Sequence, residues 1–303
     1  MSGSSGLIGS ALVQALMRSG HRVARMVRRS AGAEEISWDP AGGELHPGDL
    51  EGMDGVIHLA GENVGARWTS ARKARIRDSR VGGTRLVSET LARLRRPPRV
   101  LISASAIGIY GNRGDEVLTE SSGVGDPTDD FLVSVAQEWE AAAEPARAVG
   151  IRVVHPRFGI VLSLSGGALK RMLPVFRLGV GGRLGSGSQW MSWISIDDAV
   201  GAILHALSSE TLRGPVNTTA PEPLTNRDFA ETLGRVLGRP SRFPVPAAAL
   251  RLALGEMADG TVLTSVRALP TRLLESGYRF EHPHLEGALR HVLGKEPATN
   301  FPA

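Results

Sequence analysis

Three glycines near the start of the chain have the spacing of a phosphate-binding turn. Gly3, Gly6 and Gly9 form a G-x-x-G-x-x-G pattern, and apolar residues at helical spacing follow directly. Glycine permits positive φ angles and lets backbone N–H groups approach an anion, which then lies at the positive end of the helix. Leu7 and Ile8 fit the first turn of that helix. The pattern predicts a turn that binds the pyrophosphate of a dinucleotide.

The residues after the next predicted strand indicate which dinucleotide this would be. A site for NAD usually places Asp or Glu about twenty residues beyond the glycines, whereas a site for NADP offers arginine to the 2′-phosphate. Here the strand ends in Val27-Arg28-Arg29, and the first acid is Glu34. We therefore expect Arg28 to bind the 2′-phosphate, with Arg29 as the next candidate, and NADP to be favoured over NAD. The alternative is a solvated strand end in an arginine-rich chain.

The elements that must position these residues alternate between strands and helices. Apolar runs predict the strands, and apolar residues at helical spacing predict the helices. Strands are expected at 21–27, 36–39, 55–60, 99–103 and 151–155, and long helices at 69–93 and 131–149, the second with a kink at Pro145. This alternation is typical of βαβ units. The expected fold class is therefore α/β, a Rossmann-type doubly wound parallel sheet with helices on both faces.

The strand that should precede the glycine turn has no counterpart in the sequence. A turn of this kind follows a strand, but only Met1 and Ser2 stand ahead of Gly3. We therefore expect the first strand to be missing from the chain. The strands at 21–27 and 55–60 would then stand about two strand spacings apart, ~9–10 Å.

The alternation of strands and helices weakens after residue 163, which suggests a second domain. We expect a dinucleotide-binding domain of residues 1–163 and 188–220. A smaller substrate-side domain would comprise residues 164–187 and 221–303. Asp197 and Asp198 are expected to cap a helix that runs to about Leu207.

Composition excludes several classes of function. The 303 residues contain no cysteine, which rules out disulfides, thiolate metal sites and a cysteine nucleophile, and agrees with a cytoplasmic location. No apolar run approaches the ~20 residues of a membrane span. The eight histidines lack paired spacing, so no metal site is expected. Of the 35 cations, 32 are arginines, but they form no basic-aromatic stripe, so we expect no nucleic-acid partner.

Several further motifs occur together. They are HLAGEN at 58–63, RWT at 67–69, SR at 79–80, SASAIGIYG at 103–111, RFGIVL at 157–162 and WISIDD at 193–198. With the glycine turn, they resemble the epimerase-like branch of the extended short-chain dehydrogenase/reductases. These are NAD(P)-dependent epimerases and dehydratases. Residues 245–293 resemble the small C-terminal domain of unknown function that closes such proteins.

The resemblance implies a set of cofactor-binding residues. The glycines, with Leu7 and Ile8, would hold the pyrophosphate, and Arg28 would take the 2′-phosphate. Further residues would lie along the cofactor or reach it from neighbouring elements; these are Leu59, Ala60, Gly61, Arg80, Ser103 and Arg157. The alternatives are a surface helix charge for Arg80 and a strand-end cation for Arg157.

The usual catalytic pair of short-chain reductases is absent. In that family Tyr and Lys stand four residues apart on one helix face, so that the ammonium lowers the pKa of the phenol. Neither tyrosine of this chain has a lysine four residues later, and Phe131 and Val135 occupy the matching helix positions.

Three explanations for the missing pair stay open. Tyr110 could act as the acid, with Ser105 or Ser103 polarising a carbonyl. A carboxylate could replace it, the candidates being Glu120, Glu138 and Glu140. Alternatively, the protein binds NADP(H) without chemistry, as a sensor. We expect an NADP-dependent oxidoreductase or a nucleotide-sugar-epimerase-like enzyme, with Ser105 and Tyr110 as catalytic residues. It would act on an unknown small molecule, as a monomer or homodimer.

Overall fold

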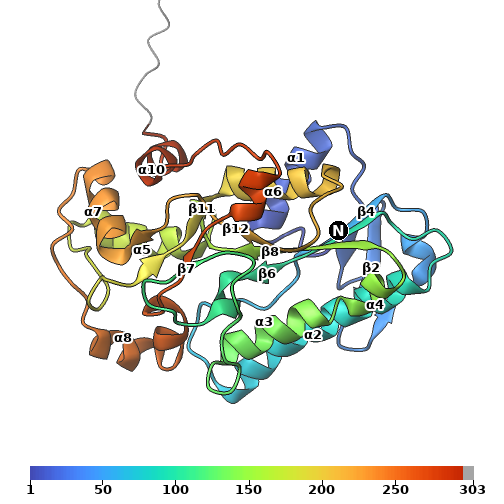
Figure 1. The fold of residues 1–303 in the computed structure, drawn as a ribbon, viewed down its shortest axis with the longest axis horizontal. Coiled ribbons are helices and arrows are strands. Elements are labelled where there is room, and N and C mark those ends of the chain that lie inside the picture. Colours follow the sequence, from blue (N-terminus) through green and yellow to red (C-terminus); the bar gives the residue numbers. More distant parts are fainter. Residues whose placement is uncertain (296–303) are drawn as a thin grey trace, which may run out of the picture.

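A parallel sheet between two layers of helices forms the larger part of the computed structural model, which describes residues 1–295 (Figure 1). Its strands, in spatial order, are β4 (Gly55–His58), β5 (Val100–Ser103), β8 (Arg152–Phe158) and β12 (Gly214–Thr218), and the short β6 (Ser105–Ala106) pairs with the end of β8. Every pairing among them is parallel. The expected α/β class with a parallel Rossmann-type sheet is confirmed.

A second, smaller sheet continues this arrangement beyond β4. It contains β1 (Arg25–Val27), β2 (Glu35–Asp39) and β3 (Glu44–Leu45), with β1 parallel to β2. Met1 and Ser2 lie between β1 and β4, where the backbone N–H of Met26 donates to the Met1 carbonyl (2.7 Å) and that of Ser2 to the Ile57 carbonyl (2.9 Å). These two residues occupy the position that the sequence assigns to the first strand.

Helices cover both faces of the sheet, as Figure 1 shows. One face carries α1 (Leu7–Arg18) and α6 (Ile196–Ser208), and the other carries α2 (Ser70–Ala92), α3 (Phe131–Ala141) and α4 (Glu144–Ala148). Strand side chains alternate between the faces. Ile102 and Val154 therefore join the core beneath α1 and α6, while Leu101 and Val153 join the core beneath α2 and α4.

Two local expectations were wrong in detail. The helix expected over 131–149 is two helices, because Pro145 starts a new first turn instead of kinking a continuous helix. At α6 the N-cap is Ser195, whose Oγ accepts from the backbone N–H of Asp198 (2.9 Å), and Asp197 and Asp198 lie in the first turn. The same hydroxyl donates to Oδ2 of Asp198 (2.9 Å), so of the two carboxylates only that of Asp197 lies outside the cap.

The smaller C-terminal domain has its own apolar core. Buried side chains from α5 (Gly167–Arg177), α7 (Asn226–Leu237) and α10 (Leu285–Val292) meet there, Leu173, Phe229 and Leu289 among them. The remaining helical elements are η1 (Pro47–Leu50), η2 (Ile107–Tyr110), α8 (Ala247–Leu254), η3 (Ala258–Val262) and α9 (Thr271–Glu275). The remaining strands are β7 (Val117–Leu118), β9 (Ile160–Leu162), β10 (Trp190–Met191), β11 (Trp193–Ser195), β13 (Leu224–Thr225) and β14 (Arg267–Ala268). Within residues 1–295, no helix is both long and apolar enough to cross a bilayer.

Candidate functional site

The glycine turn leads directly into α1, as expected. Gly6 is the N-cap and donates its backbone N–H to the Gly3 carbonyl (3.0 Å). No side chain in the described part of the chain caps this helix, and its first turn holds no acid. The first N–H groups of α1, those of Leu7 and Ile8 included, have no intrahelical acceptor. The turn therefore offers an anion several backbone donors and the positive end of a helix.

Two of the glycines are required by close backbone packing. Gly3 has φ +67°, and a Cβ on it would lie 2.6 Å from the carbonyl carbon of Leu59. A Cβ on Gly9 would lie 2.0 Å from the Gly3 oxygen. Gly6, by contrast, is exposed. The outer glycines thus fit the turn against β4 and α1, and the middle one leaves the backbone accessible to a ligand.

Arg28 stands at the same edge of the sheet as the glycine turn. Because the strands are parallel, Arg28 follows β1 where Gly3 follows Ser2 and where Leu59 and Ala60 follow β4. The side chain of Arg28 is exposed and makes no hydrogen bond or ion pair with any residue of the described chain. Arg29 instead donates to Glu35 at 2.8 Å. Of the two arginines, Arg28 is the one whose guanidinium is available to a phosphate.

The side chain of Arg80 hydrogen-bonds to the loop that follows β4. Its Nη1 donates to the carbonyl of Glu62 (2.9 Å), while the hydroxyl of Ser79 accepts from the backbone N–H of Glu62 (2.9 Å). The Arg80 guanidinium lies 5.0 Å from the ring centre of Trp139. Burial lowers the pKa of Arg80 to about 10, with the charge of Glu62 acting in the opposite direction. Arg80 therefore holds the backbone beside Gly61, and its contact with a cofactor stays a prediction.

Arg157 lies inside a buried network that joins α3, β6, β8, η2 and β12. Its Nε and Nη2 donate to the two carboxylate oxygens of Glu140 (2.8 and 2.9 Å), and Ser105 also donates to Glu140 (2.6 Å). Its Nη1 donates to the Tyr110 hydroxyl (3.0 Å). Burial alone would raise the pKa of Glu140, but Arg157 and Ser105 hold it below its ordinary value. We call Ser105, Tyr110, Glu140, Arg157 and Asn217 the Arg157 network.

Tyr110 is enclosed by this network. The side chain is fully buried, and its hydroxyl accepts from Arg157. Its single proton faces two acceptors, the Thr119 carbonyl (3.0 Å) and Oδ1 of Asn217 (2.8 Å). Burial raises the pKa of Tyr110, although Arg157 and Asn217 oppose the shift. The structure thus joins Ser105 to Arg157 through Glu140 and Tyr110 to Arg157 directly, but it leaves the phenol no open side.

Ser103 differs from Ser105 in having an unengaged hydroxyl. Ser103 ends β5 at the edge that carries the glycine turn, and its Oγ is buried without a hydrogen-bond partner among the described residues. Buried hydroxyls are usually paired. An unpaired hydroxyl at the strand ends is free to hydrogen-bond to a bound ligand. Of the two serines, Ser103 is therefore the better candidate for contact with a ligand.

The helix positions that match the missing Tyr–Lys pair are apolar and packed. Phe131 lies edge-on to Trp68 with ring centres 5.3 Å apart, and Val135 is buried in the same cluster as Met257. The nearest lysine, Lys73, lies over the Phe131 ring and pairs with Glu256 at 2.5 Å. This position therefore holds no titratable pair.

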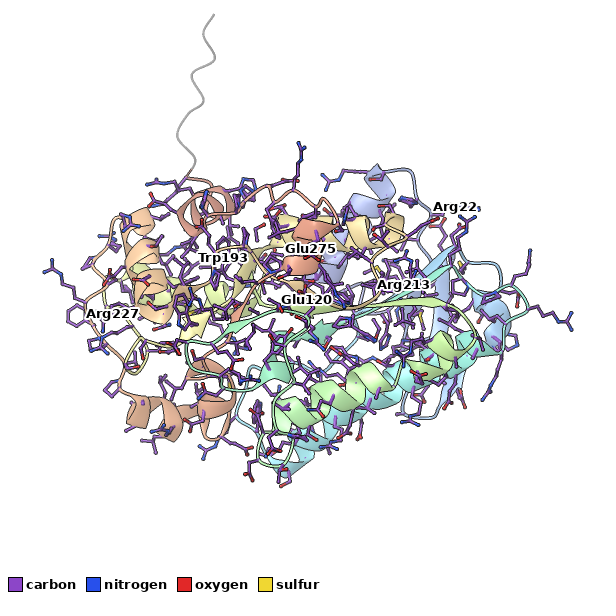
Figure 2. The ribbon with its side chains drawn as sticks, viewed as in Figure 1. Arg22, Glu120, Trp193, Arg213, Arg227 and Glu275 are labelled. Atoms are coloured by element: carbon purple, nitrogen blue, oxygen red, sulfur yellow. The ribbon has the colours of Figure 1, made fainter. Side chains whose placement is uncertain are left out.

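The three candidate carboxylates also have partners. Glu138 pairs with Arg77 (2.6 Å), and Glu140 belongs to the Arg157 network. Glu120 lies in the interior of the molecule (Figure 2), where its Oε1 accepts from the backbone N–H groups of Asn217 (2.9 Å) and Arg272 (3.2 Å). Burial raises the pKa of Glu120 despite these donors.

Comparison with known proteins places this arrangement in a family. The NAD dependent epimerase/dehydratase family matches residues 1–217, and a domain of unknown function, DUF1731, matches residues 245–292. The chain belongs to the NAD dependent epimerase/dehydratase family. The family resemblance expected from the motifs is thereby confirmed, including the small C-terminal domain.

Relatives of this family cover nearly the whole chain. The epimerase family protein Mb2239 of Mycobacterium bovis is 44% identical over 294 residues, 96% of each chain. The crystal structure of human epimerase family protein SDR39U1 with NADPH is 33% identical, with a TM-score of 0.87 over 97% of this chain and 98% of that one. A nucleoside-diphosphate sugar epimerase from Corynebacterium glutamicum is 36% identical, with a TM-score of 0.80 over 99% of this chain and 59% of that one. The expectation of a nicotinamide dinucleotide cofactor agrees with the family's description and with the human structure.

His58, beneath the glycine turn, is expected to make the stability of the protein depend on pH. The ring is fully buried, and Nδ1 lies 2.7 Å from the Ser2 hydroxyl. Burial, and secondly the nearby N-terminal charge, lowers the pKa of His58 from 6.5 to about 4. Between pH 6.5 and 4 the imidazole of His58 is protonated in the unfolded chain but stays neutral in the folded protein. We therefore expect the free energy of unfolding to fall by about 3 kcal/mol between pH 6.5 and 4 because of this residue.

Urea unfolding at several pH values checks this prediction. His58→Asn keeps a polar partner for Ser2 and removes the titration, so its stability should fall less steeply over that range. His21→Asn, at an exposed histidine, is the matched control and should follow the unmodified protein. Burial also lowers the pKa of the Met1 amino group to about 5, so only the difference between the two slopes reports on His58. Identical slopes for all three proteins would contradict the prediction.

Proposed function

We propose that this protein binds NADP(H) at the edge formed by the glycine turn and the ends of β1, β4, β5 and β8. The observation that carries the proposal is the pairing of an uncapped α1 N-terminus with an exposed, unpartnered Arg28 one strand away. The outer glycines leave no room for a Cβ. When bound, the nicotinamide would supply or accept a hydride.

We assign the individual roles from the same contacts. The backbone of Gly3–Gly9 would hold the pyrophosphate, Arg28 the 2′-phosphate, and Leu59, Ala60 and Gly61 the adenosine half. Arg80 would position the loop of Gly61. Ser105, Tyr110 and Arg157 would fix the strand ends through their buried network, while Ser103 would present its hydroxyl to the bound ligands.

The reaction we propose is NADP-dependent oxidation–reduction or epimerase-type chemistry on a small molecule. Membership of the family and the sugar epimerase among its relatives support this class. The smaller domain would contribute the substrate side, and the protein would act as a monomer or homodimer. The cytoplasm stays the predicted location.

The preference for NADP over NAD can be tested at Arg28. We expect Arg28→Ala to weaken NADPH binding by about 10- to 100-fold, since a charge-assisted bond to phosphate contributes about 1.5–3 kcal/mol. NADH carries no 2′-phosphate, so its affinity should not change. A fluorescence titration with each nucleotide measures both dissociation constants.

Arg22→Ala is the matched control for the Arg28 variant. It removes the same charge from an exposed position before β1, at the periphery of the molecule (Figure 2). Its affinity for NADPH should equal that of the unmodified protein. Tighter binding of NADH than NADPH by the unmodified protein, or an equal loss in both arginine variants, would refute the role of Arg28.

A second candidate function is a non-catalytic NADP(H) sensor on the same fold. The observation that favours it is the apolar packing of Phe131 and Val135 where a catalytic pair would stand, together with the enclosed phenol of Tyr110. NADPH oxidation across a panel of carbonyl compounds separates the two functions. Turnover that persists in Tyr110→Phe would leave the enzyme in place but remove Tyr110 from its chemistry.

A further inference from the structure

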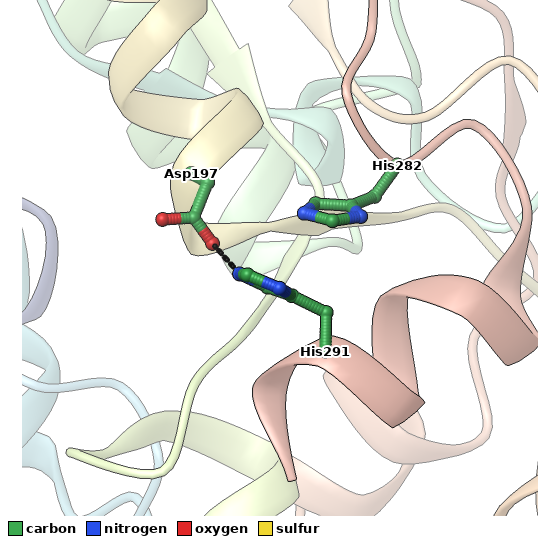
Figure 3. Close-up of side chains that lie close together, drawn as sticks. All are labelled: Asp197, His282 and His291. Carbon is green, nitrogen blue, oxygen red and sulfur yellow. Dashed lines mark ion pairs between the residues drawn. The ribbon is translucent and has the colours of Figure 1, made fainter. Parts of the chain in front are cut away.

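Three side chains that the sequence shows no reason to connect meet outside the dinucleotide site. Asp197 lies in the first turn of α6, His282 in the segment before α10, and His291 in the last turn of α10. One possible ligand atom from each lies within 4.8 Å of the others (Figure 3). The histidines stand nine residues apart, and Asp197 lies far from both in the sequence. The spacing of these residues in the sequence therefore does not predict the cluster.

One pair of side chains in the cluster already has the spacing of two ligands of the same metal ion. Nε2 of His291 lies 3.3 Å from Oδ2 of Asp197. Two ligands bound at ~2.0–2.1 Å to a tetrahedral zinc ion are themselves about 3.3 Å apart. The imidazole rings lie face to face, with centres 4.2 Å apart. In both rings, Nε2 lies on the side that faces the carboxylate of Asp197 (Figure 3).

His282 carries an independent indication of a ligand. Its Nε2 is buried and has no hydrogen-bond partner within the described residues. A buried ring nitrogen without a partner is uncommon, because its desolvation is not compensated. A metal ion held between this nitrogen, His291 and Asp197 would provide the missing partner.

The neighbouring Asp198 fixes the position of His282 relative to α6. Asp198 is fully buried, and its carboxylate accepts from the backbone N–H groups of Glu281 (2.8 Å) and His282 (3.0 Å). The hydroxyl of Tyr278 donates to the same carboxylate at 3.2 Å. These hydrogen bonds to Asp198 hold the segment of His282 against the first turn of α6, which carries Asp197, before any ion binds, as a preorganised site requires.

We propose that Asp197, His282 and His291 form a binding site for a divalent transition-metal ion of the zinc type. Imidazole nitrogens with one carboxylate suit Zn²⁺ and its neighbours rather than Mg²⁺ or Ca²⁺, which prefer oxygen ligands. Three protein ligands leave one tetrahedral position for water. The bound ion would join α10 to α6, and so the C-terminal domain to the sheet-bearing domain.

Zinc binding by the tag-free, chelator-treated full chain tests the site. Isothermal titration with ZnCl₂ should show one ion per chain, and zinc should raise the melting temperature. Asp197→Asn and His291→Gln should each weaken binding at least about tenfold, the loss expected for one ligand. Both positions are partly exposed, so these variants should fold even if His282→Gln does not. Melting without zinc checks this.

His284→Gln provides the matched control. His284 belongs to the same segment but pairs with Glu222 (2.8 Å) and lies outside the cluster. Its zinc affinity should equal that of the unmodified protein. Absence of stoichiometric binding by the unmodified protein would overturn the proposal. So would equal affinity in the Asp197 and His291 variants, because the ion would then bind elsewhere and the cluster would be an ion pair beside stacked imidazoles only.

Discussion

Gly9→Ala is expected to weaken NADPH binding by about 10- to 100-fold and to lower the free energy of unfolding by about 1–3 kcal/mol. The new Cβ would lie 2.0 Å from the Gly3 oxygen and 2.8 Å from its carbonyl carbon. Both neighbours are backbone atoms, so no side chain can rotate away. Helix α1 must move off the turn, and its N-terminal N–H groups move with it.

Gly82→Ala is the matched control for this prediction. Gly82 is exposed within α2, and nothing lies within 4 Å of the position that its Cβ would take. Alanine there should leave the affinity for NADPH unchanged and raise stability by about 0.5–1 kcal/mol, because glycine is unfavourable inside a helix. NADPH titration and urea unfolding of both variants make the comparison. Unchanged affinity in Gly9→Ala would contradict the close packing of turn and helix as the basis of the site.

Glu140→Ala is expected to lower the free energy of unfolding by about 3–5 kcal/mol. The substitution leaves the guanidinium of Arg157 buried without its carboxylate partner and removes the acceptor of the Ser105 hydroxyl. The side chain of Arg157 is only 5% exposed, so water cannot replace the lost partner. Urea unfolding at neutral pH measures the loss.

Glu144→Ala is the control, since Glu144 pairs with Arg147 on the surface three residues away. Exposed pairs of this kind contribute about 0–1 kcal/mol. A double variant, Glu140→Met with Arg157→Met, should recover part of the stability lost in Glu140→Ala, because it removes the buried charge altogether. Equal losses in Glu140→Ala and Glu144→Ala would show that the Arg157 network does not stabilise the fold.

Gly9→Ala and Glu140→Ala together distinguish loss of NADPH binding from loss of stability. The Arg157 network contains Arg157, which the family resemblance places at the cofactor, and Ser105 and Tyr110, which the sequence offers as catalytic candidates. If the network only positions the strand ends, its variants should have a lower free energy of unfolding but the same dissociation constant for NADPH as the unmodified protein. Gly9→Ala, by contrast, changes the surface that the dinucleotide would touch.

The sequence by itself determined the features that depend on neighbouring residues. Alternating apolar runs and helical spacing predicted the parallel α/β sheet, because strand and helix periodicities are local. The glycine turn and its helix were predicted as well, since Gly3, Gly6 and Gly9 stand within seven residues. The position of Arg28 directly after β1 also follows from the sequence, and its role at the 2′-phosphate stays a prediction.

Only the tertiary structure decided what the distant residues do. Arg157 meets Glu140 across 17 positions, and Tyr110 meets Asn217 across 107. Asp197 of α6 meets His282 and His291, which stand more than 80 positions later in the chain. Each of these side chains looks like an ordinary surface or strand-end residue in the sequence, because its partner and its burial are set by how the elements pack. Whether Arg28 is free, whether Tyr110 is enclosed and whether two histidines converge are properties of that packing, and no local pattern encodes them.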